Sequence, residues 1–506
     1  MAITRRDFIA GLIGGPALVR LTKKAPRPIA GGFVDDGMTL GHSLRDGVDT
    51  SAPRDRRRVQ VAIIGGGIAG LSAAWELERS GMRDFLVLEL APIAGGNARY
   101  GENEISAYPW AAHYVPVPGP RATLVRELFE ELGVLHNGEW EERFLCFSPE
   151  ERLFLYGEWH SGIEPEFAMS AKDRSEFRRF AELIDAHRSS GEFTIPSALG
   201  RPASSPLDRL SMEAWLQEQG FSSSRLRWYA EYACRDDYGA SLRETSAWAG
   251  IHYFASREPN EDGPLTWPEG NGWIAKRLIA KLGAYIETNA PVIRGRREGA
   301  RWRLTTPSTE YDVDLVIWAA PAFVVPYIVD ELRNERRRTG FVYSPWLTAN
   351  LTLDRWPAER GIEPAWDNVI YDSPGLGYVV ATHQSLRTVQ ERTVWTYYRS
   401  FADLTPEKGR QELATRDWSY WRDDILNDLA RAHPDIRDCV SRIDVLRLGH
   451  AMIRPTMGFL SVAERARPTP LPRFLHAHSD QSGLSLFEEA QYHGVMAARR
   501  ALAGSW

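Results

Sequence analysis

The chain has 506 residues, of which 43% are hydrophobic and 11% aromatic, so it is long enough for two or more hydrophobic cores. Its formal net charge is −6, and loss of residues 1–30 would remove six basic residues and one acidic residue, which lowers the charge to −11. This acidic balance excludes nucleic acid as a natural partner and favours a small-molecule substrate, with a cation favoured electrostatically.

The N-terminus carries a candidate export signal. Residues 4–9 read TRRDFI, and a weakly apolar, glycine-rich run follows up to Val19. The run is too short and too rich in glycine for a membrane span. The pattern resembles a twin-arginine signal over residues 1–30, which implies the twin-arginine export machinery as a partner and a periplasmic or otherwise exported protein. The alternative is a disordered basic tail. Residues 31–57 are rich in Pro, Gly and Asp and predict a linker or arm.

The next segment predicts a dinucleotide-binding unit. Residues 59–64 form a short apolar run typical of a buried parallel strand. Three glycines follow as G-x-G-x-x-G, namely Gly65, Gly67 and Gly70, and a helix begins within them, with Ile68 and Ala69 in its first turn. Residues 85–88 predict the second strand, and Glu89 ends it where a carboxylate would bind ribose hydroxyls. The strand, helix and acid make this glycine pattern specific, because the free N–H groups of the helix then face a pyrophosphate.

A second glycine pair separates FAD from NAD. The stretch ELAPIAGGNARY contains Glu89 and Leu90, then Gly95, Gly96, Asn97 and Arg99. It resembles the segment after the ribose acid in flavoproteins of the amine oxidase, protoporphyrinogen oxidase and phytoene desaturase superfamily. This family usually has arginine where this chain has Asn97, so Arg99 would only partly replace it. A further glycine bend lets the chain run close to the pyrophosphate, and arginine can neutralise phosphate charge. The alternative is a plain surface turn.

Two later stretches resemble the same superfamily. Residues 283–292 and 314–321 are similar to its middle strands, and this implies an adenine contact for Val292. Near the C-terminus, Asp480 follows an apolar strand, and a helix begins near Phe487. The resemblance implies that Asp480 binds the ribityl chain and that the N-terminus of this helix faces the flavin.

The resemblance implies an α/β fold, in which a Rossmann-like FAD-binding domain assembled from discontinuous segments carries an inserted α+β substrate domain. The predicted FAD-binding segments are 58–135, 263–338 and 441–506, and the predicted substrate-domain segments are 136–262 and 339–440. The three cysteines form no metal or redox pair and read as buried small residues. No cysteine matches a family site for a covalent flavin link, so we expect noncovalent FAD.

Aromatic residues supply the candidate substrate side. The segment 108–118 corresponds to the family's segment beside the flavin ring, which makes Trp110, His113 and Tyr114 the first catalytic candidates. His113 could exchange a proton near neutral pH, or it could be an ordinary core histidine. Trp395 and Tyr397 would share one face of a strand and could bind a cation or an apolar chain, although most such aromatics belong to the core. Other polar candidates are His383, His450 and the pair Asp236 and Asp237.

One absence bears on the reaction. The chain has no lysine between Lys281 and Lys408, where many amine oxidases of this superfamily place a lysine near the flavin. This puts simple amine oxidation and fast reaction with oxygen in doubt, and the electron acceptor is unknown. We expect an amine oxidase-like enzyme that passes hydride from a substrate C–H to flavin N5. The alternatives are a desaturase or porphyrinogen oxidase acting on an apolar substrate, and a non-redox flavoprotein or binding protein.

Overall fold

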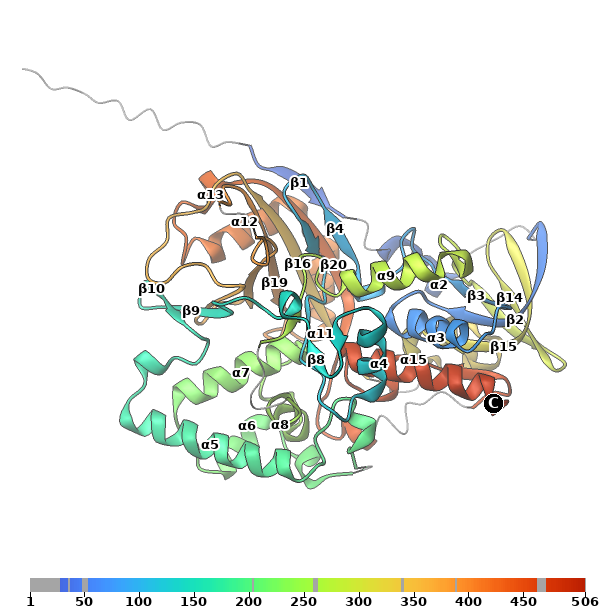
Figure 1. Cartoon of the computed structure of the whole chain (residues 1–506), viewed down its shortest axis with the longest axis horizontal. Coiled ribbons are helices and arrows are strands. Elements are labelled where there is room, and N and C mark those ends of the chain that lie inside the picture. The colour runs from blue at the N-terminus through green and yellow to red at the C-terminus, as the bar shows by residue number, and fades with distance from the viewer. Residues whose placement is uncertain are drawn as a thin grey trace, which may run out of the picture.

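The computed structural model describes residues 28–34, 37–47, 53–202, 204–257, 263–337, 341–386, 389–461 and 470–505. The twin-arginine motif at residues 4–9 lies outside the described residues. Figure 1 shows two sheets side by side, with a layer of helices next to one of them. No helix within the described ranges is long and apolar enough to cross a membrane.

The first sheet assembles three distant parts of the chain. Its strand order is β12-β3-β2-β15-β14-β13, and β21 also pairs with β15. The strands are β2 (Asp55–Ile64), β3 (Phe85–Leu88), β12 (Ile286–Glu287), β13 (Arg294–Glu298), β14 (Arg301–Thr305), β15 (Thr309–Trp318) and β21 (Phe474–His476). β12, β3, β2, β15 and β21 are parallel, which explains their continuous apolar runs. The predicted Rossmann-like, discontinuous α/β fold is confirmed.

Helices cover this sheet, and two of them touch at the backbone. They are α3 (Ile68–Arg79), α4 (Thr123–Glu131), α9 (Gly272–Leu282) and α15 (Phe487–Leu502), with the smaller α2 (Met38–Asp46) and α10 (Val325–Ile328) nearby. α3 and α15 lie side by side (Figure 1). A Cβ atom added at Gly494 would lie 2.2 Å from the carbonyl oxygen of Ala69. The absence of a side chain at Gly494 therefore sets how closely α15 approaches α3.

The second sheet has the order β1-β20-β16-β19-β18-β17-β9-β10. Its strands are β1 (Ala30–Phe33), β9 (Glu151–Leu155), β10 (Glu158–Ser161), β16 (Val342–Leu353), β17 (Asp367–Ile370), β18 (Gly377–Val380), β19 (Thr393–Ser400) and β20 (Val440–Arg454). One face packs on α11 (Pro406–Thr415), α12 (Trp418–Leu429) and α13 (Ile436–Cys439). The other face carries a separate aromatic cluster, so the alternating side chains of each strand serve two environments.

A helical layer and short hairpins complete the described fold. The layer consists of α5 (Ala171–Ser189), α6 (Met212–Glu218), α7 (Ser224–Tyr238) and α8 (Ala247–Ala255), which share one hydrophobic core. The short strands pair as β4 (Tyr100–Glu102) with β5 (Ala107–Pro109), β6 (Tyr114–Val115) with β11 (Leu265–Thr266), and β7 (Leu135–His136) with β8 (Glu139–Trp140). The cysteines Cys146, Cys234 and Cys439 are free and buried, as expected of small apolar residues.

β1 and β20 fall outside the segments predicted for the substrate domain. β1 lies in the predicted arm 31–57 and its flank, and β20 lies almost wholly in the predicted FAD segment 441–506, yet both pair within the second sheet. A strand's own pattern does not name its pairing partner, which explains the difference. Near its end β20 also meets the other layers. Asn97 donates to the Ala451 carbonyl at 2.9 Å, Ser246 N–H donates to Pro455 at 2.8 Å, and Arg454 pairs with Glu244 at 3.0 Å.

We expect Gly494→Ala to lower the free energy of unfolding by at least about 2 kcal/mol, because the new methyl group overlaps the backbone of α3. Chemical denaturation of the full chain measures the change. Gly283→Ala is the matched control, since its Cβ would meet nothing within 4 Å and its φ of −52° suits alanine. Equal stability of the two variants would contradict the proposed close contact between α15 and α3.

Candidate functional site

The three glycines after β2 are needed for different reasons. Gly65 has a φ of +103°, which favours glycine, and a Cβ at Gly70 would lie only 1.9 Å from the Gly65 carbonyl oxygen. Gly67 differs from both, because its φ is −75° and its Cβ would have only the Gly96 Cα, 3.9 Å away, as a neighbour. Within the described residues, therefore, nothing in the protein fills the space beside Gly67. Ile68 and Ala69 are buried in the first turn of α3, which begins there.

Glu89 and the glycine pair close this loop from the other side. The Glu89 carboxylate accepts hydrogen bonds from the N–H groups of Gly66 at 2.6 Å and Ala91 at 2.8 Å. Gly95 N–H donates to the Gly66 carbonyl at 2.8 Å. Gly95 and Gly96 have φ values of +131° and +57°, and a Cβ at Gly96 would lie 3.1 Å from the Gly67 Cα. The second glycine pair is thus required because two backbone loops pack against each other beside Glu89.

The residues after the pair tie the loop down. Asn97 uses its amide to bind Ala451 of β20, and the Arg99 Nε donates to the Gly96 carbonyl at 3.1 Å. Arg99 is therefore positioned at the bend, where its charge could act on a phosphate. Leu90 is half-buried directly after β3. Asn97, which stands where the family usually has arginine, therefore links this loop to the second sheet.

Val292 lies near the same edge of the sheet. β12 pairs with β3, and the Ala290 N–H donates to the Glu89 carbonyl at 2.8 Å, so the chain after β12 runs beside Glu89. The Val292 side chain is 4% exposed and packs in the core with Leu86 and Leu88. Val292 is therefore a core residue at this edge of the sheet, and its contact with adenine stays a prediction.

Asp480 is held rigidly after β21. Its Oδ2 accepts hydrogen bonds from the Ala322 N–H and the Tyr343 hydroxyl, both at 2.7 Å. Its Oδ1 is buried and accepts no hydrogen bond within the described residues, although His478 Nδ1 lies 3.0 Å away. That ring nitrogen also lies 3.2 Å from the Asp480 backbone nitrogen. The partners Tyr343 and Ala322 lie far from Asp480 in the sequence, and no local pattern pointed to them.

Phe487 begins α15, where the prediction placed the start of this helix. Its ring stacks on Phe129 with centroids 6.1 Å apart, so the side chain belongs to the core. The open space at Gly67 suits a group that approaches backbone N–H groups closely, and the unpartnered Asp480 oxygen suits a hydroxyl donor. These two observations fit the pyrophosphate and the ribityl chain of FAD.

His113 and Tyr114 belong to an aromatic cluster with Tyr398 of β19 and with Trp366, which directly precedes β17. The His113 ring centroid lies 5.1 Å from that of Tyr114, 5.6 Å from Trp366 and 4.6 Å from Tyr398. Burial lowers the pKa of His113 to about 4, so it is neutral at physiological pH. The prediction that His113 exchanges protons near neutral pH is therefore not supported. Trp110 lies apart and packs edge-on to Tyr108.

Trp395 and Tyr397 point away from this cluster. Both are fully buried on the face of β19 that packs against α12 and α13. Trp395 stacks on Tyr378 at 4.0 Å, and the Tyr397 hydroxyl donates to Asp428 at 2.8 Å. The prediction that they share a face holds, but that face is the core, and the neighbouring Tyr398 faces His113 instead. Alternation fixes which residues share a face without fixing which face is buried.

Carboxyl groups from three elements surround the aromatic cluster. Glu151 lies on β9, Asp236 on α7 and Asp367 on β17. Burial, followed by repulsion between neighbouring carboxylates, raises the pKa of Glu151 and of Asp236 to about 7 and raises that of Asp367 well above its usual value. Burial and then the charges of Asp367 and Asp236 also raise the pKa of Tyr398. Asp236 and Asp367 therefore act on Tyr398, and Glu151 acts with them on Tyr232 of the same cluster.

Only part of this acidic charge is neutralised. Arg257 pairs with Asp237 at 3.0 Å and lies 3.4 Å from the Tyr114 hydroxyl. Asp367 accepts a long hydrogen bond of 3.5 Å from Tyr232. No ion pair involves Glu151, Asp236 or Asp367 within the described residues, and each keeps some accessible surface. Sequence reasoning found only Asp236 and Asp237, because the other acids are far away in the chain.

The remaining polar candidates lie elsewhere. His383 Nε2 donates to the Phe147 carbonyl at 2.6 Å, and His450 packs against Phe323 with ring centroids 4.7 Å apart. Burial lowers the pKa of both imidazoles. Neither ring contacts the cluster of His113, Trp366 and Tyr398.

Comparisons with known proteins agree with this architecture. A family model described as a NAD(P)-binding Rossmann-like domain matches residues 63–132. The 15-cis-phytoene desaturase of Narcissus pseudonarcissus is 30% identical over 147 residues, which make up 28% of this chain and 24% of the desaturase. The matched stretch thus spans about a quarter of that relative.

Solved structures match over most of the chain. Putrescine oxidase bound to putrescine has a TM-score of 0.67 and 16% identity and covers 88% of this chain and 100% of its own. Cyclohexylamine oxidase from Brevibacterium oxydans has a TM-score of 0.65 and 14% identity, with 88% and 99% covered. A fatty acid isomerase from P. acnes has a TM-score of 0.61 and 15% identity, with 87% and 98% covered. These solved structures confirm the fold that the resemblance implied.

We expect Gly67→Ala to fold normally and to lose flavin, because its methyl group would enter the open space where a phosphate would approach. Flavin absorbance per mole of purified chain, with added FAD, should fall at least tenfold. Thermal unfolding without added FAD controls for the fold. Gly70→Ala is the contrasting variant, since it should destabilise the apo-chain itself. A Gly67→Ala variant that binds FAD as the wild type does would contradict this role.

Proposed function

Because the chain has the fold of amine oxidases, we propose that it is an FAD-dependent oxidoreductase that oxidises an amine. The backbone at Gly67 would hold the pyrophosphate, Glu89 the ribose, and Asp480 the ribityl chain of noncovalently bound FAD. Bound FAD would supply the hydride acceptor for a C–H bond next to the nitrogen. The electron acceptor that reoxidises the flavin is a separate question.

The observation that carries the proposal is the set of acids without ion-pair partners beside the aromatic cluster. Glu151 and Asp236 are the two that ionise near pH 7. A substrate ammonium group would form the ion pair that neither carboxylate makes among the described residues. The faces of Trp366 and Tyr398 would favour the same cation. Carboxylates and aromatic rings together therefore support a cationic amine.

One of these carboxylates would also accept the proton that the substrate's ammonium group must lose. An amine must lose its ammonium proton before the neighbouring C–H bond can be oxidised. A carboxyl group with a pKa of about 7, as in Asp236, can bind the ammonium ion when ionised and can hold the proton after transfer. His113 is neutral and half-buried, and it would orient Tyr114 and Tyr398 through ring packing.

A desaturase-like reaction on an apolar substrate is the second candidate. The stretch that matches the phytoene desaturase and the missing lysine between Lys281 and Lys408 favour it. The aromatic cluster would then bind a hydrocarbon by burial. The unneutralised acids argue against this reading, because an apolar substrate would leave them unpaired. A non-redox flavoprotein is the further alternative, and a flavin that no amine reduces would point to it.

We expect Asp236→Asn to lower kcat/KM for an amine at least tenfold, because an amide neither attracts nor deprotonates an ammonium ion. In the wild type, affinity for the amine should rise roughly tenfold between pH 6 and pH 8, since Asp236 and Glu151 ionise near pH 7. This rise should be smaller in the variant. Anaerobic bleaching of the flavin band by a panel of amines measures both effects.

The matched control is Asp185→Asn on the outer helix α5, where the carboxylate is exposed and pairs with Arg188. Its kinetics should equal those of the wild type. If no amine bleaches the flavin, or if Asp236→Asn behaves like the control, the proposed function is wrong.

We also propose export through the twin-arginine route, which carries folded proteins and so suits one that acquires FAD before transport. The support is the sequence TRRDFI at residues 4–9. Replacing Arg5 and Arg6 by lysine should retain the chain in the cytoplasm with its flavin content unchanged, as cell fractionation would measure. An unchanged distribution between the fractions would exclude this route.

A further inference from the structure

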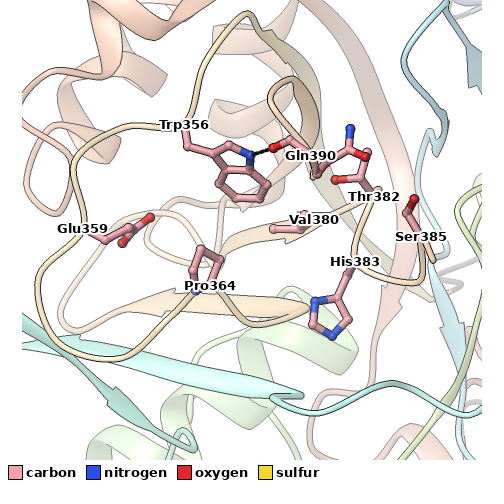
Figure 2. Close-up of a pocket in the computed structure, with 8 residues that line it drawn as sticks. All are labelled: Trp356, Glu359, Pro364, Val380, Thr382, His383, Ser385 and Gln390. Atoms are coloured by element: carbon pink, nitrogen blue, oxygen red, sulfur yellow. Dashed lines mark hydrogen bonds between the residues drawn. The ribbon is translucent and has the colours of Figure 1, made fainter. Parts of the chain in front are cut away.

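A cavity lies at the second sheet, on the side opposite the aromatic cluster. Its volume is about 410 Å³, within the usual range for small-molecule sites, and it is lined by Trp356, Glu359, Pro364, Val380, Thr382, His383, Ser385 and Gln390 (Figure 2). Val379 packs in the aromatic cluster, whereas its neighbour Val380 packs in the core on the other face of β18. The cavity is therefore separate from the site of the proposed function.

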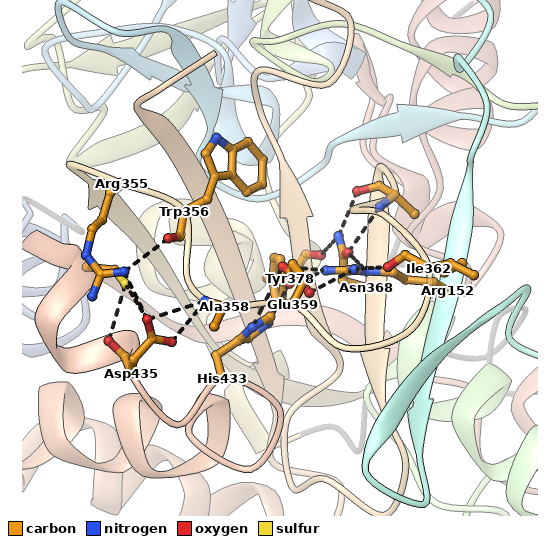
Figure 3. A network of polar contacts seen from close by, with 12 residues as sticks. Arg152, Arg355, Trp356, Ala358, Glu359, Ile362, Asn368, Tyr378, His433 and Asp435 are labelled. Carbon is orange, nitrogen blue, oxygen red and sulfur yellow. Dashed lines mark hydrogen bonds and ion pairs between the residues drawn. The ribbon is translucent and has the colours of Figure 1, made fainter. Parts of the chain in front are cut away.

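Glu359 is fixed in the wall by a buried arginine. Arg152 is fully buried and reaches both Glu359 oxygens, at 3.1 and 3.3 Å. The same guanidinium group donates to the Asn368 side chain at 2.5 Å and to the Ile362 carbonyl at 3.1 Å (Figure 3). A carboxylate held in this way has one orientation, and its remaining lone pairs can still accept hydrogen bonds.

The network behind Glu359 determines the tautomer of a buried histidine. The Tyr378 hydroxyl accepts from Arg152 at 3.1 Å and therefore uses its own hydrogen toward His433 Nε2 at 2.8 Å. Burial lowers the pKa of His433 to about 3, so the neutral ring carries its proton on Nδ1. That atom has no hydrogen-bond partner within the described residues and lies 3.9 Å from Glu359 Oε1. Glu359 Oε1 therefore receives no direct hydrogen bond from His433.

Three other polar side chains of the cavity, those of Trp356, His383 and Gln390, donate hydrogen bonds to backbone carbonyls. The Trp356 indole N–H donates to the Gln390 carbonyl at 2.6 Å, and His383 Nε2 donates to Phe147. The Gln390 side-chain amide donates to the Arg392 carbonyl. The acceptors in the lining include the Glu359 oxygens, His383 Nδ1 and the Gln390 side-chain oxygen. A ligand that donates hydrogen bonds therefore suits this lining.

We propose that this cavity binds a small organic cation that carries N–H groups, such as a primary alkylammonium ion. Its ammonium group donates to Glu359, and the face of the Trp356 indole and the side chains of Pro364 and Val380 cover its alkyl part. Figure 2 shows these side chains arranged around one common space. The site does not depend on flavin or on the proposed amine oxidation.

The test uses tert-butylammonium chloride, which has no C–H bond next to its nitrogen and so cannot be oxidised there. Isothermal titration calorimetry is performed on the full chain carrying Asp236→Asn, so that the site of the proposed function is weakened. Binding should be measurable, and Glu359→Gln should weaken it at least tenfold. Because that variant leaves Arg152 without its carboxylate, circular dichroism checks its fold.

Two substitutions of Trp356 test the proposal without removing the carboxylate that pairs with Arg152. Trp356→Phe and Trp356→Leu both lose the hydrogen bond to Gln390, but only phenylalanine keeps an aromatic face. The leucine variant should bind tert-butylammonium at least threefold more weakly than the phenylalanine variant. The proposal is overturned if the Asp236→Asn chain binds no tert-butylammonium at millimolar concentration. Equal binding by the two Trp356 variants would overturn it as well.

Discussion

The parallel pairing of β15 with β2 and with β21 is the constraint on which the candidate cofactor site depends. It aligns strands from the start, the middle and the end of the chain, so that Gly65, Ala322 and Asp480 follow strand ends at one edge of the sheet. Strand carboxyl ends at such an edge form the usual ligand crevice of parallel sheets. The hydrogen bond from Ala322 to Asp480 links two of these ends directly. Without this register, the sequence motifs would have no common location.

The features that could be predicted are those encoded locally. The glycine loop, Glu89 and the start of α15 are each recognisable within a short stretch, because tight turns and helix starts have strong residue preferences. The role of Gly67 at a pyrophosphate stays a prediction, although the open space beside it distinguishes it from Gly65 and Gly70. By contrast, the orientation of β19 was not predictable, since both faces of that strand carry aromatic residues and only packing decides which face is buried.

The acids around the aromatic cluster show a second limit of sequence reasoning. Glu151, Asp236 and Asp367 are separated by more than eighty residues at each step, and each alone resembles an ordinary polar residue. Their shared environment arises from the pairing of β9 with β17 and from the placement of α7. Burying carboxyl groups together is costly, and their raised pKa values express this cost. Such clusters persist where binding or chemistry compensates for the lost stability.

β20 connects all three layers of the described fold. It pairs with β16 along its length and accepts a hydrogen bond from Asn97, which follows the second glycine pair. At its end, Arg454 pairs with Glu244 of the helical layer. The layers are therefore not independently folding domains joined by a flexible hinge. Expression of one layer alone, or its release by proteolysis, would remove the contacts of β20 with the other two layers. The chain should accordingly melt as a single cooperative unit, and isolated fragments of it would be poor starting points for engineering.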